Sequence, residues 1–99
     1  MKRYDIYAGI NGNSEYQGTE EFNDLSEALA AAYNIAVEIY ESYEGYHGIM
    51  SWGDCRDDLE QSYPDEIFTT EDVDAHYQNI IEETIEFNAI PSAYRPESN

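Results

Sequence analysis

The segment from Asp24 to Glu44 constrains the fold most, because its apolar residues recur at the spacing of a single helix face. Asp24 and Glu27 form a capping pair at the start of this segment, and Gly45 offers a stop at its end. The apolar stripe consists of Leu25, Ala28, Leu29, Ala32, Ala36, Ile39, Tyr40 and Tyr43. A helix with such a stripe has to bury it, so the sequence predicts a second layer of structure that covers this helix.

The N-terminal residues predict that second layer. Residues 2–10 alternate between apolar and polar side chains, which is the period of a half-buried strand. Residues 11–14 are Asn-Gly-Asn-Ser and tolerate the positive φ angles of a tight turn. Residues 16–22 then close a hairpin, although Gly18 weakens this second strand. Because a hairpin is not stable alone, we expect it to pack against the helix.

A short helix is predicted next, with Ser51 as its cap. It ends before Pro64, because the residue that precedes a proline disfavours the α conformation. Its apolar side chains are Trp52, Cys55 and Leu59. The segment that follows, Ile67–Phe68, is the candidate for a third strand.

The capping pair Thr69 and Asp72 predicts the start of a second long helix. Its apolar stripe consists of Val73, Tyr77, Ile80, Ile81, Thr84 and Ile85. Residues 91–99 have no periodic pattern, so we expect a disordered C-terminal tail. The sequence thus predicts one α+β domain over residues 1–90, with a small antiparallel sheet packed by two main helices and one short helix.

Charge restricts the partners of this domain. The chain has 22 Asp and Glu against 4 Lys and Arg, a net charge of −18, and Arg56 is the only base between Tyr4 and Tyr94. Binding to DNA, RNA or an anionic membrane surface is excluded, because the electrostatic term that drives it has the wrong sign. A disordered acidic segment is also excluded, because 41% of the residues are hydrophobic and ten are tyrosine. We expect a basic partner.

The chain is expected to be a soluble, cytoplasmic protein. No apolar run approaches the roughly 18 residues that a membrane span needs. The first residues lack the apolar stretch of a secretory signal. Cys55 is the only cysteine, so no internal disulfide forms.

Motifs for catalysis or metal binding are incomplete. The only imidazoles and thiol, on His47, His76 and Cys55, match no familiar zinc-ligand spacing. Two oxygen-rich groups are fragments of calcium loops: Asp54, Asp57, Asp58 and Glu60, and separately Asn11, Asn13 and Glu15. No glycine-rich phosphate loop or nucleophile motif is present in the sequence. We therefore expect no enzymatic activity, no cofactor and no bound metal, and interpret the acidic groups as solvated faces.

Rows of carboxylates are the remaining signal. Glu38, Glu41 and Glu44 are spaced by three residues, and on the last predicted helix Glu82 and Glu86 are four apart. Side chains at this spacing have Cβ atoms about 5–6 Å apart, close to the separation of successive phosphates on a nucleic-acid strand. Tyrosines in loops or at edges, namely Tyr16, Tyr46 and Tyr63, would add contact area, while Tyr33, Tyr40 and Tyr77 are expected in the core. The predicted partner-binding residues are Glu38, Glu41, Glu44, Tyr46, Asp54, Asp57, Asp58, Glu82, Glu83 and Glu86.

With this size, charge and these carboxylate rows, the chain resembles the small acidic proteins of phages and mobile elements that mimic DNA. That class includes anti-restriction proteins, anti-CRISPR proteins and inhibitors of uracil-DNA glycosylase, and its members share no fold. The resemblance implies a non-catalytic inhibitor that occupies the basic nucleic-acid-binding groove of a host protein, and it leaves the target open. The alternative is a structural or scaffolding interaction module of phage type whose acidity serves solubility, and adaptation to high salt is a separate explanation of the acidity.

Overall fold

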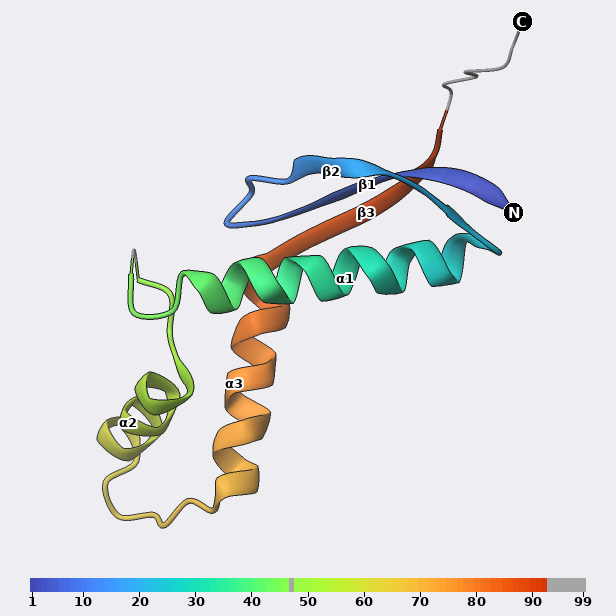
Figure 1. Ribbon diagram of the computed structural model, residues 1–99. Helices are drawn as coiled ribbons and strands as arrows, with labels where there is room; N and C mark the ends of the chain where they lie inside the picture. Colours follow the sequence, from blue (N-terminus) through green and yellow to red (C-terminus); the bar gives the residue numbers. More distant parts are fainter. Residues whose placement is uncertain (47, 93–99) are drawn as a thin grey trace, which may run out of the picture.

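A three-stranded antiparallel sheet and three helices form the fold (Figure 1). The computed structural model describes residues 1–46 and 48–92. The strands are β1 (Lys2–Ile10), β2 (Glu15–Phe22) and β3 (Ile85–Pro91), in the order β2-β1-β3. The helices are α1 (Leu25–Ser42), α2 (Trp52–Ser62) and α3 (Thr70–Thr84). The predicted α+β class, with a small antiparallel sheet, is confirmed.

The turn between β1 and β2 is built from the residues that the sequence indicated. Asn11 and Gly12 have φ angles of 53° and 80°, and the Asn13 N–H donates to the Ile10 carbonyl at 3.0 Å. The turn lies so close to β1 that a Cβ on Gly9 would be 1.9 Å from the Asn13 carbonyl oxygen. Glycine at position 9 is therefore a requirement of the hairpin.

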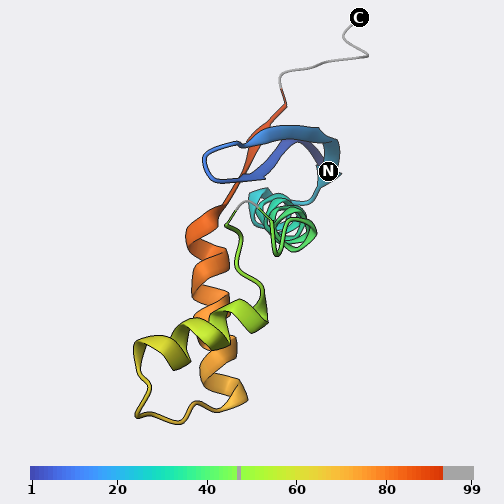
Figure 2. The same ribbon diagram turned by 90° about the vertical axis from the view of Figure 1, so that its left-hand side faces the viewer.

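One face of the sheet is covered by α1, which Figure 2 shows almost end-on beneath the strands. The helix begins as predicted, with the Asp24 carboxylate accepting from the Glu27 N–H at 3.0 Å. The helix residues buried along the contact are Ala28, Ala32, Ala36 and Tyr40, and those of β1 are Tyr4, Ile6 and Ala8. The three alanines are four residues apart and so lie on one face of the helix, where their small side chains allow the helix to approach the larger side chains of the strand.

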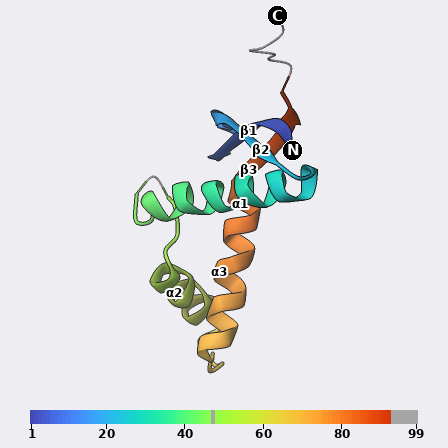
Figure 3. The same cartoon turned by 45° about the vertical axis from the view of Figure 1, so that its right-hand side comes forward.

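Helices α2 and α3 lie beside each other and project away from the sheet (Figure 3). Residues 51–84, which comprise both helices and the loop between them, are called the arm below. Two polar contacts join the helices: the Trp52 Nε1–H donates to Asp74 at 2.7 Å, and His76 Nε2 lies 3.0 Å from an Asp58 oxygen. The predicted caps are present, since Ser51 and Thr69 each form a complete capping box.

The predicted third strand at Ile67–Phe68 is wrong. These residues lie in the loop of the arm, and the Ile67 side chain is 95% exposed. The third strand is β3, which begins where α3 ends: Thr84 is the last helical residue, and Ile85 is already extended, with φ −78° and ψ 154°. Ile67 and Phe68 lie in the short loop between α2 and α3, both of which lie away from the sheet. Residues 85–91 follow α3 and pair along β1.

The first two residues of the predicted tail, Pro91 and Ser92, take part in the fold. Pro91 ends β3, and Ser92 is buried, with its N–H donating to the Arg3 carbonyl at 2.9 Å. Residues 93–99, the rest of the predicted tail, and His47 lie outside the described residues.

Candidate interaction surface

The carboxylate row predicted on the first helix is interrupted. Glu38 and Glu41 are exposed on α1, but the helix ends at Ser42 and Glu44 lies beyond its cap. Glu44 is half-buried, and its carboxylate accepts a hydrogen bond from the Tyr77 hydroxyl of α3. The expectation of three equivalent carboxylates on this helix is therefore wrong, because one of them joins two elements.

The row predicted on the last helix is also divided. Glu82 and Glu83 are exposed on α3, and Glu82 accepts from the Gln78 side chain at 3.2 Å. Glu86 lies on β3 instead, opposite Gly9 in the register of the sheet. A Cβ on Gly12 would be 3.4 Å from the Glu86 carboxylate, so Glu86 belongs to the hairpin end of the sheet.

Three of the predicted site residues are brought together around Cys55, the buried thiol of α2. Burial raises the pKa of Cys55, and the carboxylates of Asp58, Asp54 and Glu44 raise it further. The thiol therefore stays protonated near neutral pH and is a poor nucleophile. Asp54 closes the α2 capping box, so this part of the acidic surface also holds the fold together.

Two tyrosines lie at the same junction between α1 and the arm. Burial raises the pKa of Tyr40 to about 12, with the neighbouring Cys55 and Glu44 adding to the shift. Burial likewise raises the pKa of Tyr77, and its hydrogen bond to Glu44 acts in the same direction. The Tyr40 hydroxyl donates to the Met50 carbonyl at 2.6 Å. Both phenols are thus neutral donors with structural roles.

The arm carries a concentrated negative charge. Residues 51–84 contain eleven Asp and Glu against a single Arg. That base, Arg56, lies 3.5 Å from Asp57 and 5.9 Å from the centre of the Trp52 ring. The 15 residues of α3 span about 22 Å, so the arm presents about one net charge per 2 Å of its length. B-DNA has one charge per about 1.7 Å, a closely similar density.

The tyrosine predictions are largely confirmed. Tyr46, Tyr16 and Tyr63 are exposed by 66%, 57% and 54%, respectively. Tyr40 is fully buried, whereas Tyr33 and Tyr77 are half-buried at the edge of the core. Tyr46, the one tyrosine among the predicted site residues, lies in the loop that follows α1, apart from the arm.

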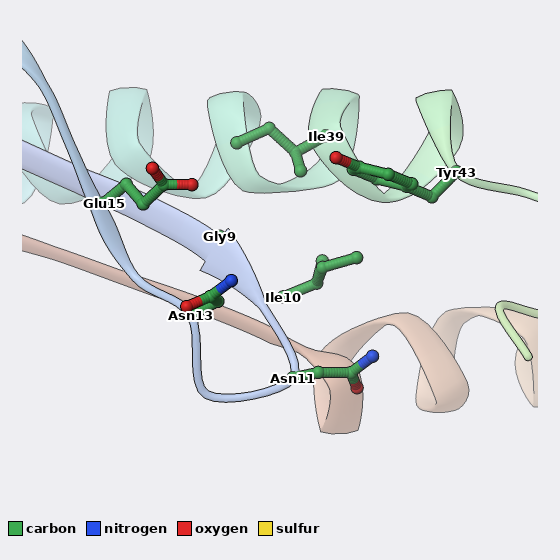
Figure 4. Close-up of a pocket in the computed structure, with 7 residues that line it drawn as sticks. All are labelled: Gly9, Ile10, Asn11, Asn13, Glu15, Ile39 and Tyr43. Carbon is green, nitrogen blue, oxygen red and sulfur yellow. The ribbon is translucent and has the colours of Figure 1, made fainter. Parts of the chain in front are cut away.

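A pocket that the sequence analysis missed lies between the hairpin turn and the C-terminal half of α1 (Figure 4). We call it the hairpin pocket. Its volume is about 290 Å³, and it is lined by Gly9, Ile10, Asn11, Asn13, Glu15, Ile39 and Tyr43. The oxygen-rich group Asn11, Asn13 and Glu15 was a sequence signal for this place. The contribution of α1 was not visible, because it depends on how the helix lies on the sheet.

The positions of the possible metal ligands and the character of the helices bear on whether the described residues could hold a metal ion or cross a membrane. In residues 1–46 and 48–92, no three His, Cys, Asp or Glu side chains are grouped to hold a metal ion. His76 contacts Asp58 and Cys55 is buried on α2, while His47, the remaining candidate zinc ligand, lies outside the described residues. No helix in this part of the chain has the length and apolar character needed to cross a bilayer.

Comparisons with the models of protein families, with curated proteins and with solved structures found no match for this chain. Function must therefore be inferred from the charge, the exposure and the geometry of the chain's own residues.

Proposed function

We propose that this protein is a non-catalytic DNA mimic that occupies the basic nucleic-acid-binding groove of a host defence or DNA-processing protein. The observation that carries the proposal is the charge density of the arm, which approaches that of duplex DNA over the length of α3. The C-terminal half of α3 packs against α1, whereas α2 and the N-terminal half of α3 project away from the sheet and are open to a partner (Figure 1).

Several carboxylates of the arm are fixed in position, as phosphates are fixed along a duplex. Asp54 and Asp72 close the capping boxes of α2 and α3, while Asp58 and Asp74 bond to side chains of the opposite helix. All four residues remain exposed. Fixed charges lose little conformational entropy on binding, so each contributes more to affinity than a freely rotating carboxylate does.

The partner's defining property is a groove that binds duplex DNA, which suggests a competition experiment. The protein is immobilised and a bacterial lysate is passed over it at low salt. We expect the specifically retained proteins to be eluted by duplex DNA, and not by polyglutamate at the same concentration of negative charge. Equal elution by the two polymers would contradict mimicry and favour an acidic surface that serves solubility, because only charge would then matter.

A pair of matched variants locates the binding surface. The arm variant changes Glu60, Glu71 and Glu83 to Gln, and the control changes Glu20, Glu21 and Glu38 to Gln. All six residues are exposed and lack a side-chain partner in the described part of the chain, so both variants should fold and both lose three charges. We expect the arm variant alone to weaken partner binding, by about 1–3 kcal/mol at low salt. Equal losses would show that the arm has no special role.

A further inference from the structure

We infer that the hairpin pocket binds an alkylguanidinium group, as presented by an arginine side chain of the basic partner. The assignment of the chemical group rests on the pocket alone. The assignment of its source to a protein partner rests on the proposed function, which it extends by adding a contact point outside the arm.

The walls of the pocket come from three elements (Figure 4). Ile39 lines it from α1 and Tyr43 from the cap that follows this helix, with the Tyr43 ring beside the Ile39 side chain. Ile10 lines it from the end of β1, and Glu15 supplies a carboxylate from the start of β2. The turn residues Asn11 and Asn13 complete the rim.

Hydrogen bonds hold the polar wall in place before any ligand arrives. The Asn11 N–H donates to the Thr84 carbonyl at 3.0 Å, which fixes the turn to the end of α3. The Gln17 side chain donates to the carbonyls of Ala8 and Glu15, at 3.1 and 3.2 Å, where the register of β1 and β2 shifts. The backbone that carries the carboxylate is therefore preorganised, which lowers the entropic cost of binding.

The lining matches the parts of an arginine side chain. A guanidinium is planar, has five N–H donors and no acceptor, and pairs with a carboxylate in a two-pronged geometry. Glu15 supplies that carboxylate, and Asn13 adds a polar side-chain amide on the same side of the pocket (Figure 4). The aromatic face of Tyr43 attracts a cation, and the isoleucines suit the methylene chain.

Size and charge exclude the main alternatives. A volume of about 290 Å³ is at the lower limit for ligand pockets, which suits one side chain and not a drug-sized molecule. An anion is disfavoured, because the lining includes the Glu15 carboxylate and no Lys or Arg. Lys2 and Arg3 pair with the other end of β2. Calcium takes six to eight oxygen ligands, and this pocket has one carboxylate.

The test is a titration of the ¹⁵N-labelled protein, followed by nuclear magnetic resonance, with two guanidinium probes. n-Butylguanidinium is a free alkylguanidinium with a single positive charge, and N-acetyl-arginine amide presents the same group on a peptide unit. We expect saturable shifts confined to the amides of the pocket-lining residues, and binding about fivefold tighter than that of butylammonium, which lacks the planar donors. Tighter binding of the arginine amide than of n-butylguanidinium supports a protein source, and the reverse order overturns that part of the inference.

A matched pair of variants provides the control. Glu15→Gln removes the pocket carboxylate, and Glu20→Gln removes an exposed carboxylate elsewhere on β2. We expect Glu15→Gln alone to weaken binding of the arginine amide, by about fivefold to tenfold, with unchanged dispersion of the remaining spectrum. Shifts spread over the whole acidic surface, or equal weakening in both variants, would overturn the inference. Because these probes need no partner, the pocket can stand while the mimic proposal fails, and the DNA competition above can succeed while the pocket fails.

Discussion

The Tyr77 hydroxyl donates a hydrogen bond to the Glu44 carboxylate and so joins α3 to the turn that follows α1. The Tyr77 ring also contacts Tyr40 edge-on, with ring centres 6.2 Å apart. This contact explains why a carboxylate that looked like one more surface charge in the sequence is half-buried. It also holds the base of the arm against the helix that packs on the sheet.

Glu44→Gln should therefore destabilise the fold, whereas Glu38→Gln should not. Both substitutions remove one negative charge, but only at position 44 does a neutral amide replace a carboxylate that accepts a charge-assisted hydrogen bond from a half-buried donor. We expect the free energy of unfolding to fall by about 1–2 kcal/mol for Glu44→Gln and to change by less than about 0.5 kcal/mol for Glu38→Gln. Urea unfolding measures both values. Equal stability of the two variants would show that the Tyr77 contact contributes nothing.

Stability should fall in alkaline solution through the buried Tyr40. An unfolded tyrosine loses its proton near pH 10, whereas the folded pKa of Tyr40 is about 12. Between these values the folded state holds a proton that the unfolded state has lost, so the free energy of unfolding decreases as the pH rises. The contribution is complete below pH 10. The expected slope for this group is about 1.4 kcal/mol per pH unit.

Urea unfolding at a series of alkaline pH values tests this slope in the parent and in Tyr40→Phe. The variant should lose the part of the slope that belongs to Tyr40, while also being less stable at neutral pH because the Met50 carbonyl loses its donor. An identical slope in the two proteins would assign the alkaline sensitivity to other groups.

Gly9→Ala should disrupt the hairpin. The added Cβ would lie 1.9 Å from the Asn13 carbonyl oxygen, a backbone atom that cannot move without opening the turn. We expect a loss of about 3 kcal/mol or more, measured by thermal or urea unfolding. Gly53→Ala is the control, because its Cβ would approach nothing closer than a Ser51 hydroxyl at 3.8 Å. A stable Gly9→Ala protein would mean that the turn adapts easily.

Trp52→Phe should loosen α2 from α3 without unfolding the sheet. The substitution removes the indole N–H that donates to Asp74 and keeps an aromatic ring in place. Amide hydrogen exchange should become faster in α2, by about five- to tenfold, and remain unchanged in β1. Equal acceleration in both elements would show that the arm and the sheet unfold as one unit.

Calcium and zinc should leave the melting temperature unchanged within error. Asp54 is occupied in a capping box and Asp58 in its contact with His76, so neither is free to complete a metal site. A scan with and without each ion tests this expectation. A rise of several degrees at submillimolar calcium would indicate a site on α2.

Local signals predicted most of the helices and the hairpin. The pairs Ser51 with Asp54 and Thr69 with Asp72 act within three residues, so each helix start can be predicted without knowledge of the fold. β3 was missed although Ile85, Phe87 and Ala89 alternate with polar or exposed residues. The apolar residues keep their helical spacing as far as Ile85, which is past the end of α3, so this spacing hides the start of β3. The strand that pairs with β3 is β1, which lies about 80 residues earlier in the sequence.

The candidate site was predictable in its chemistry and not in its placement. The excess of carboxylates is a property of composition, but which carboxylates are free depends on tertiary contacts. Glu44 faces Tyr77, and Glu86 lies beside the hairpin turn, because α1 and α3 each end earlier than their apolar patterns suggest. The hairpin pocket needs Glu15 and Tyr43 on opposite walls, which no local pattern indicates.

β3 follows the arm in the sequence, and this order has a consequence for synthesis. β1 is the central strand, and one of its edges is paired only by residues 85–91. While the arm is being translated, that edge of β1 carries unsatisfied backbone donors and acceptors, so the nascent chain is open to pairing with other strands. The acidic residues that emerge in this interval give each unfinished chain a growing negative charge, and mutual repulsion keeps such chains apart until the last strand arrives.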